Sequence, residues 1–406
     1  MALDPVVSAF FIVSGILITG YIASILLDKF GIPDPIILIL AGMVIGPLGG
    51  LADPTQFQNL AIYLGALAFV AIMFESSLGI NIQELFGSAK AALTLALISF
   101  LLSLVATTLV VHLLLGYSMI EGALLGSIIG GSSGAVVAAV VNKLSLNPPL
   151  PLILSIESLL TDVFCIVTYV VLKWVIVSPQ RLTEAAGFVA SKFSTSIVLG
   201  FVFGLLIASV IYKFRKQKHN YIAILSILIF LYALSEYLGG NGAIAVLMAG
   251  IILSNIEYLP SYLSSEERVE IVKYQRIFLE SFHSELTLII KVFFFVEIGL
   301  LFQVRNLVYL SMATLFAILL LLIRIPAAWA TTKISKEELN LGLITVFYAR
   351  GLAAAVLAID VVNDPNLAII MTETTRQFFL QVASGVVVIT NLILTIVYLI
   401  LRGKRG

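Results

Sequence analysis

The feature that most constrains this sequence is a long series of apolar stretches, each close to 20 residues in length. Within one of them, residues 315–323 read LFAILLLLI with no polar residue. A helix of about 20 apolar residues can cross the hydrocarbon core of a bilayer. A transmembrane β-strand would instead alternate apolar and polar residues over about 10 positions. We therefore expect an all-α membrane protein.

Composition excludes several other classes of protein. Of the 406 residues, 60% are hydrophobic and 11% are charged, whereas about a quarter of the residues in a soluble domain are charged. High hydrophobicity also excludes a disordered chain. The 23 basic and 23 acidic side chains leave no net charge, which argues against a nucleic-acid partner. The single cysteine, Cys165, excludes an internal disulfide.

The apolar windows and the polar residues between them predict thirteen transmembrane helices. Turns at Gly239-Gly240 and near Gly116 separate spans that would otherwise merge. The long polar connection 257–285 fits either an interfacial amphipathic helix or an extension of the tenth span. The expected spans are 6–27, 34–52, 58–80, 89–114, 119–142, 150–177, 188–213, 220–238, 241–256, 286–304, 307–331, 339–362 and 377–401.

Basic residues predict how these spans are oriented. With the N-terminus outside, the loops on one side carry fifteen Lys and Arg residues and those on the other side carry four. Because cytoplasmic loops are enriched in Lys and Arg, we expect a cell-membrane protein with an external N-terminus and a cytoplasmic C-terminus. Residues 1–5 lack the basic start of a cleavable signal, so we expect the first span to be retained.

Polar or helix-breaking residues interrupt two spans at mid-depth. The fifth contains Gly130-Gly131-Ser132-Ser133-Gly134 and the twelfth contains Tyr348-Ala349-Arg350-Gly351. Small residues can mark close helix packing, whereas unwound backbone is tolerated only inside protein or beside water. Because the two spans are seven apart, they run antiparallel. We therefore expect two inverted six-helix repeats with crossing broken helices 5 and 12, an arrangement that indicates a transport site.

Charged residues within the spans are candidates for function, because each costs about 3 kcal/mol or more at the bilayer centre. In the sixth span, Ser158 and Asp162 lie four residues apart and share a helix face, where their oxygens suit a hard cation. Glu157 and Thr161 share another face, from which the acid can pair with an arginine of a different helix. The other candidates are Glu75, Lys291, Glu297, Arg324 and Arg350.

These motifs, in this order, resemble the monovalent cation–proton antiporter superfamily, most closely the NhaP-type sodium–proton antiporters. The resemblance covers nearly the whole chain. It rests on Gly31-Ile32-Pro33, on Gly42-Met43-Val44-Ile45-Gly46-Pro47, on the broken fifth span, on the ESxxTD run that begins at Glu157, and on Arg350-Gly351.

The resemblance implies a homodimer in the bilayer with two functional domains. Residues 1–80 and 188–304 would form a scaffold and dimerisation domain, and residues 89–177 and 307–401 an ion-transporting core. Asp162 would carry the sodium ion or the proton, with Ser158 as a further ligand. Glu157 would pair with Arg350, and Arg324 could join that pair. Oxygens of Ser132, Ser133 and Thr161 complete the candidate ion-binding set.

The sequence departs from the family pattern at two places. Thr161 stands where an asparagine is usual, and Ser132-Ser133-Gly134 stands where Thr-Asp-Pro is usual. The second departure is similar to the potassium-efflux relatives, and it leaves the choice of ion open.

The sequence therefore predicts a secondary antiporter, not an enzyme, without a cofactor. It would exchange one sodium or lithium ion for one proton by alternating access, without net charge transfer. A potassium–proton antiporter or potassium efflux protein is the alternative. An intramembrane serine protease is a remote alternative, because residues 130–134 match G-x-S-x-G. Its base would have to be His112, near the outer end of the fourth span, or His219 or His283, both expected in cytoplasmic loops.

Overall fold

The structure, a computed structural model, describes residues 5–30, 32–50, 54–78, 80, 82–144, 146, 149–177, 185–217, 219–258, 266–303, 305–335 and 338–403. Gly31, which contributes to the family resemblance, lies outside the described residues. So do five of the basic residues used to predict the orientation, namely Arg181, Lys218, Lys336, Lys404 and Arg405.

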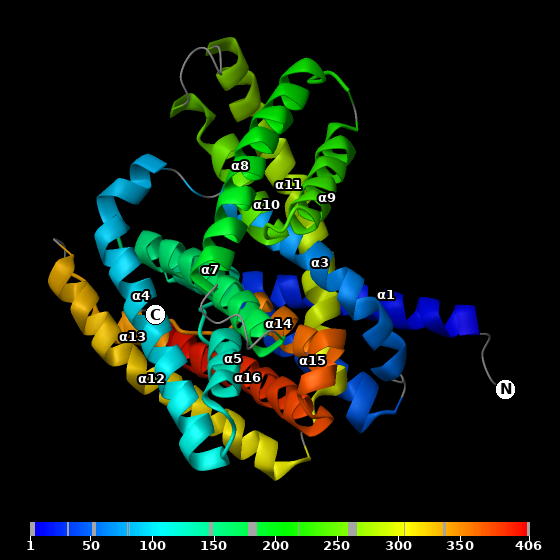
Figure 1. The fold of residues 1–406 in the computed structure, drawn as a ribbon, viewed down its shortest axis with the longest axis vertical. Coiled ribbons are helices and arrows are strands. Elements are labelled where there is room, and N and C mark those ends of the chain that lie inside the picture. Colours follow the sequence, from blue (N-terminus) through cyan, green and yellow to red (C-terminus); the bar gives the residue numbers. More distant parts are fainter. Residues whose placement is uncertain are drawn as a thin grey trace. The chain divides into compact units, whose positions relative to one another are not determined.

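Helices account for all the regular structure of the described residues, as predicted (Figure 1). Each predicted span coincides with one helix or with two consecutive helices. Their bounds are α1 Pro5–Phe30, α2 Asp34–Met43, η1 Val44–Leu48, α3 Pro54–Leu78, α4 Ile82–Leu115, α5 Met119–Ile129, α6 Gly134–Lys143, α7 Leu150–Val177, α8 Ala185–Lys213, α9 Asn220–Tyr237, α10 Gly242–Ser254, η3 Ile256–Tyr258, α11 Glu266–Leu301, α12 Leu307–Ile334, α13 Leu341–Val346, α14 Leu352–Asn363, α15 Pro365–Ile370 and α16 Glu373–Gly403.

Seven helices of the described part of the chain are long and apolar enough to cross a membrane by themselves. Five shorter apolar segments, Asp34–Leu48, Tyr63–Leu78, Met119–Ile129, Gly242–Ser254 and Leu352–Asn363, fall within other predicted spans. The total of thirteen crossings and the inverted repeat therefore stay predictions. The turns predicted near Gly116 and at Gly239 are present, with φ values of 74° and 79° that favour glycine.

The polar connection 257–285 is largely helical. After the short helix η3, α11 begins at Glu266 and continues without a break to Leu301. This favours the second interpretation of the connection, an extension of the tenth span. His283, expected in a loop, lies inside α11 and is fully buried.

The chain folds into two compact units. Unit 1 comprises Met1–Ile62, Gly87–Pro179 and Lys291–Gly406, and unit 2 comprises Tyr63–Phe86 and Gln180–Ile290. These boundaries describe packing in one conformation. The predicted scaffold and core concern movement during transport, and that division stays a prediction.

Unit 1 contains both interrupted spans. Helix α14 packs against α5, α7 and α16, and α16 also packs against α12 and α5. Elsewhere in this unit, α2 and α11 approach very closely. A Cβ atom on Gly42 would lie 2.9 Å from the Cα of Gly299. Lys291 of α11 forms an ion pair with Asp34 at the start of α2.

Unit 2 is built from α8, α9, α10, most of α3 and the first part of α11. Helix α10 packs against α8 and α9. The His283 ring bridges two helices through hydrogen bonds, one with the Ala71 carbonyl at 2.7 Å and one with the Tyr221 hydroxyl at 3.1 Å. Because both ring nitrogens have partners, the imidazole is a structural link between α3, α9 and α11.

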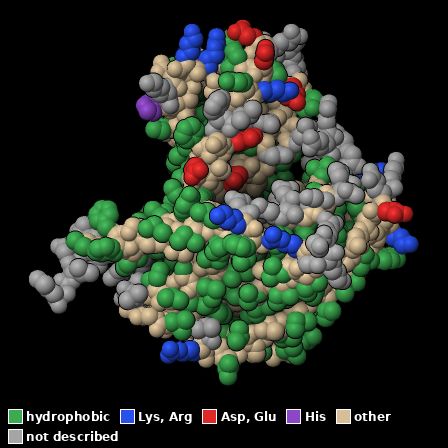
Figure 2. Space-filling view, turned by 180° about the vertical axis from the view of Figure 1, so that it is seen from behind, with side chains coloured by type: hydrophobic (Ala, Val, Ile, Leu, Met, Phe, Trp, Pro, Cys, Tyr) green, Lys and Arg blue, Asp and Glu red, His purple; other side chains and the backbone are tan. Residues whose placement is uncertain are grey.

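Exposed apolar side chains are abundant, and they cover much of the face in Figure 2. Phe10 and Phe11 of α1 are 71% and 65% exposed, and Leu113 of α4 is 71% exposed. Soluble monomers rarely expose large contiguous apolar patches. A surface of this kind is suited to contact with lipid.

Candidate ion-binding site

The break in the fifth span is present. Helix α5 ends at Ile129 and α6 begins at Gly134, and residues 131–133 between them are not helical. The sequence explains the break, since glycine and serine stabilise a helix interior poorly. The carboxyl end of α5 and the amino end of α6 therefore meet at these residues.

The twelfth span is broken in the same way. Helix α13 ends at Val346, α14 begins at Leu352, and residues 347–351 are not helical. The Ser133 amide donates a hydrogen bond of 2.7 Å to the Ala349 carbonyl. A Cβ atom on Gly351 would lie 2.5 Å from the Ser133 Cβ and closer still to its Oγ. The two breaks, residues 131–133 and 347–351, therefore touch and are called the crossing below.

Helix α7 lies against the crossing and contributes hydroxyl groups. A Cβ atom on Gly134 would lie 2.5 Å from the Ser158 Oγ. The Thr161 Oγ accepts a hydrogen bond of 3.1 Å from the Ser132 amide and lies 3.5 Å from the Ser132 Oγ. The structure thus brings Ser132, Ser133, Ser158 and Thr161 together around the first break. Thr161 is already engaged in holding the first break.

Asp162 is the acid of this site. It is half-buried one residue after Thr161, and it makes no hydrogen bond or ion pair within the described part of the chain. Its carboxylate interacts electrostatically with Glu157 and with Arg350. An acid without a bonded partner, on the same helix as the hydroxyls of Ser158 and Thr161, can bind a proton or a hard cation.

The predicted partner of Glu157 is corrected by the structure. Arg324 of α12, rather than Arg350, donates to both carboxylate oxygens of Glu157, at 2.9 and 3.0 Å, and to the Ile344 carbonyl at 2.8 Å. Glu157 is fully buried and Arg324 is 2% exposed. The planar guanidinium suits two parallel bonds to one carboxylate. This pair ties α7 to α12 and to the end of α13.

Arg350 occupies a different position. Its side chain is 2% exposed, and its Nε has no hydrogen-bond partner among the described residues. Its backbone is held from α16, where the Thr390 Oγ accepts from its amide at 3.1 Å and the Asn391 amide donates to its carbonyl at 2.8 Å. The sequence interpretation missed Thr390 and Asn391. The available signal was the pair of adjacent polar residues in the last span, which also contains Gln377, Gln381, Ser384 and Thr395.

Comparison with known proteins identifies the family. The family model of the sodium/hydrogen exchanger transmembrane region matches residues 13–401. The chain belongs to this sodium/hydrogen exchanger family.

Relatives of this exchanger transport different cations. It is 24% identical to a Na(+)/H(+) antiporter of Methanocaldococcus jannaschii, over 70% of this chain and 66% of that antiporter. It is also 24% identical to a K(+)/H(+) antiporter of Shewanella sp. (strain MR-4), over 61% of this chain and 44% of that antiporter. Both matches cover less than two thirds of the relative's length. These relatives are transporters rather than enzymes.

The fold of the exchanger is also found in solved structures. A sodium proton antiporter of Methanocaldococcus jannaschii at pH 8 matches with a TM-score of 0.81, covering 98% of this chain and 99% of that one at 20% identity. A map of the same antiporter from electron microscopy matches with a TM-score of 0.73 at 20% identity. The described residues thus share the helical fold of that antiporter. The family and the apolar helices indicate a multi-pass membrane protein.

A second polar cluster of the exchanger was not predicted as a site. Lys173 of α7 bonds Asp360 of α14 at 2.9 Å and Asp364 at 2.7 Å, and the Tyr169 hydroxyl donates to Asp360 at 2.6 Å. Asp364 lies between α14 and α15. Burial alone would raise the pKa of Asp364, but the Lys173 hydrogen bond and charge, together with two backbone amides, lower this pKa below its usual value. The cluster joins α7 to the end of the twelfth span.

The remaining charged candidates are Glu75, Lys291 and Glu297. Glu75 of α3 is exposed. Lys291 has Asp34 as its partner. Glu297 of α11 is 4% exposed, and its Oε1 has no hydrogen bond from any described residue.

The geometry gives no support to a serine protease. The His112 ring bonds the Tyr117 carbonyl at 2.7 Å, and His283 is engaged with Ala71 and Tyr221 in unit 2. His219 is exposed at the start of α9. Within the described residues, therefore, no histidine bonds Ser132.

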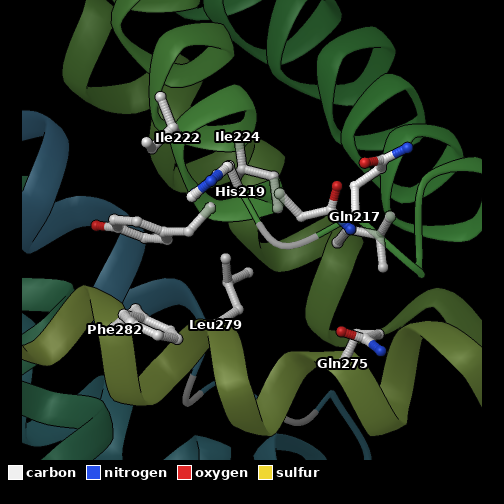
Figure 3. A pocket seen from close by; sticks show the side chains of 10 residues that line it. Gln217, His219, Ile222, Ile224, Gln275, Leu279 and Phe282 are labelled. Carbon is white, nitrogen blue, oxygen red and sulfur yellow. The ribbon is translucent and has the colours of Figure 1, made fainter.

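Unit 2 contains a cavity of about 370 Å³, shown in Figure 3. Gln217, His219 and Gln275 contribute polar groups, and Leu279 and Phe282 contribute apolar ones. None of the side chains that line it is acidic. Because the cavity offers no carboxylate, it is not a second candidate for the cation site.

Proposed function

We propose that this exchanger transports one sodium or lithium ion in one direction and one proton in the other, without net charge transfer. The observation that carries the proposal is Asp162, whose carboxylate has no bonded partner in the described structure. It follows Thr161 on α7, the helix whose Ser158 and Thr161 contact the first break. One carboxylate can hold one monovalent cation or one proton. Competition for that acid couples the two fluxes.

The surroundings of Asp162 suit this role. Ser158 lies one helical turn before Asp162 on α7, and Ser132 and Ser133 belong to the first break, which Thr161 of α7 contacts. Their hydroxyls offer neutral oxygens, which hard cations prefer. The broken helices add the partial negative charge of the α5 carboxyl end, favourable to a cation. We infer that Thr161 mainly positions the first break.

Alternating access follows from the cost of moving a bare charge through a low-dielectric barrier. With sodium or a proton bound, Asp162 is neutralised and the core can move. Under this proposal residues 89–177 and 307–401 move against a scaffold of residues 1–80 and 188–304. The scaffold would form a homodimer in the cell membrane. Thirteen spans would leave the N-terminus outside and the C-terminus in the cytoplasm.

Potassium–proton exchange is the second candidate function. Two observations favour it: a relative named as a K(+)/H(+) antiporter, and the presence of Ser132-Ser133-Gly134 without the usual acid. A site with fewer charged ligands binds small, strongly hydrated ions less tightly. Parallel assays with sodium, lithium and potassium distinguish the two functions.

The test uses purified protein in proteoliposomes that contain a pH-sensitive dye and a voltage dye. Asp162→Asn should abolish cation-dependent pH changes because the amide cannot bind a proton. Wild-type protein should exchange ions without generating a potential. Glu267→Gln is the matched control, since Glu267 is 64% exposed on α11, and it should exchange normally. Exchange that persists in a folded Asp162→Asn protein would refute the proposal.

A further inference from the structure

The cavity of unit 2 has a polar end and an apolar end. Gln275, Leu279 and Phe282 of α11 line it at helical spacing, with the amide at one end of the series and the aromatic ring at the other (Figure 3). The loop between α8 and α9 contributes Gln217 and His219 to the lining. In Figure 3 Gln217 lies on the same side of the cavity as Gln275. Such a cavity suits an amphipathic ligand.

The apolar end of the cavity is bordered by exposed apolar side chains. Ile222 of α9 and Phe282 of α11 are each 61% exposed. Three further apolar lining residues, Ile211, Ile224 and Leu279, are buried. Because exposed apolar side chains of a membrane protein are suited to contact with lipid, a ligand can enter between Ile222 and Phe282 from the bilayer. The ligand is therefore expected to dissolve in the membrane.

The polar end of the cavity favours an anionic head. No described lining residue is acidic, and the amide and imidazole groups at this end can donate hydrogen bonds. Residues 211–220, which include the loop, contain four Lys and Arg residues and no acid. Among them Lys213 and Lys216 are exposed. Neutral donors alone would serve an uncharged head equally well, whereas the adjoining positive charge favours a carboxylate.

The size of the cavity limits the apolar part of the ligand. A volume of about 370 Å³ lies near the lower end of the range for small-molecule pockets. It can hold one folded hydrocarbon chain, but it cannot hold both chains of a phospholipid together with a headgroup. A long-chain fatty acid has one chain and one carboxylate, and the bilayer supplies it.

We propose that this cavity binds a long-chain fatty acid from the membrane, with its carboxylate at the Gln275 end and its chain against Leu279 and Phe282. All the residues that line the cavity belong to unit 2, whereas the crossing belongs to unit 1. The inference therefore goes beyond the proposed function and does not depend on it.

A bound chain would act on helix contacts that are already in place. Tyr221 of α9 lines the cavity and stacks on Phe282 of α11, with 6.0 Å between the ring centroids. Its hydroxyl also bonds the His283 ring at 3.1 Å, and that ring bonds the Ala71 carbonyl of α3 at 2.7 Å. A ligand packed against Tyr221 and Phe282 therefore stabilises the link between α3, α9 and α11. Because it binds the folded protein, it should raise the melting temperature.

The test uses purified protein in phosphatidylcholine nanodiscs at alkaline pH, with palmitate as the probe. Palmitate should raise the melting temperature, and hexadecanol, which has the same chain without the charge, should raise it much less. A photoreactive diazirine analogue of palmitate should label peptides that contain residues 217–224 and 275–282. Equal stabilisation by palmitate and hexadecanol, or labelling confined to other segments, would overturn the inference.

Substitutions at the polar end test the position of the carboxylate. Gln275→Glu adds a negative charge with little change of shape, so it should weaken palmitate binding about tenfold or more by repulsion and leave hexadecanol binding unchanged. Gln275→Lys should retain palmitate binding. Gln303→Glu is the matched control, since Gln303 is exposed between α11 and α12 in unit 1, and it should bind palmitate like wild type. Unchanged palmitate binding in Gln275→Glu would overturn the inference.

Two further comparisons separate this site from phospholipid binding and from the transport site. Phosphatidylglycerol that displaces the diazirine analogue as well as palmitate does would overturn the assignment to a single-chain ligand. Asp162→Asn should bind palmitate like wild type. Exchange that persists in Asp162→Asn would refute the proposed function and leave the fatty-acid site intact. Loss of exchange in Asp162→Asn, together with no palmitate binding in any variant, would refute the fatty-acid site alone.

Discussion

Two buried arginines near the crossing have different tasks. Arg324 is bonded to Glu157 and to the end of α13, and so it fixes helices in place. Arg350 is bonded through its backbone and leaves its charge available. The two buried guanidiniums thus differ: Arg324 belongs to an ion pair, whereas the Arg350 Nε has no hydrogen-bond partner among the described residues.

The Glu157–Arg324 pair leads to a stability prediction. Glu157→Gln should lower the free energy of unfolding by about 3–5 kcal/mol, because it leaves a buried guanidinium without its counter-charge. Thermal unfolding in detergent measures the change. Lys273→Gln is the control: Lys273 bonds Glu257 at 2.8 Å but is 53% exposed, so its loss should cost less than about 1 kcal/mol. A Glu157→Gln protein as stable as wild type would contradict this account of the pair.

Sequence reasoning singled out Asp162 as the candidate ion-binding acid but did not predict the partner of Glu157. Asp162 and Ser158 could be found because they interrupt an apolar span on a common helix face. Glu157 could be assigned to another face, but helical periodicity does not say which helix faces it. Both Arg324 and Arg350 were compatible with the sequence. The tertiary contact between Arg324 of α12 and Glu157 of α7 decided between them, and a contact between distant helices has no local signal.

At the level of elements, the crossing depends on two small residues in contact. Gly351→Ala should impair transport and lower stability, because its Cβ would overlap Ser133 and the two breaks would have to separate. Ser133→Gly removes the overlapping atoms and should partly restore the melting temperature of Gly351→Ala. Gly187→Ala in α8 is the control, since no atom lies within 4 Å of its added Cβ. If the second substitution gives no recovery, the proposed contact is wrong.

The link between α7 and the twelfth span predicts a pH-dependent effect. The pKa of Asp364 is lowered in the folded protein, so its ionised form stabilises the fold above its unfolded pKa of about 3.9. That stability is lost as the pH falls through the lower, folded pKa. Asp364→Asn should therefore lower stability by about 2 kcal/mol at neutral pH, and the difference should vanish at low pH. Melting temperatures measured across pH test this, and a difference independent of pH would contradict it.

Interrupted elements were easier to predict than continuous ones. Runs of glycine, serine and polar residues marked both breaks, because such residues leave a helix weak at mid-depth. The sequence did not decide whether residues 257–285 were an interfacial helix or part of the next span. The continuity of α11 across this region depends on tertiary contacts in unit 2, such as the hydrogen bond between the His283 ring and the Ala71 carbonyl.

For the whole molecule, composition and span lengths predicted the fold class, and the family comparison confirms it. The predicted thirteen crossings, the proposed dimer and the proposed moving core concern the protein in a bilayer. Local sequence specifies these properties weakly, because several of the shorter helices are long enough to cross a membrane only when they are joined to the neighbouring helix. The functional account therefore depends most on the single acid at the crossing.

The most direct test of the central claim is to count the protons released when sodium binds to purified protein in weakly buffered detergent solution. If Asp162 holds either ion but not both, sodium should displace close to one proton per ion bound where this acid is protonated. Asp162→Asn should release none, and Glu267→Gln should behave like wild type. Sodium binding without proton release, or release that persists in Asp162→Asn, would contradict the claim.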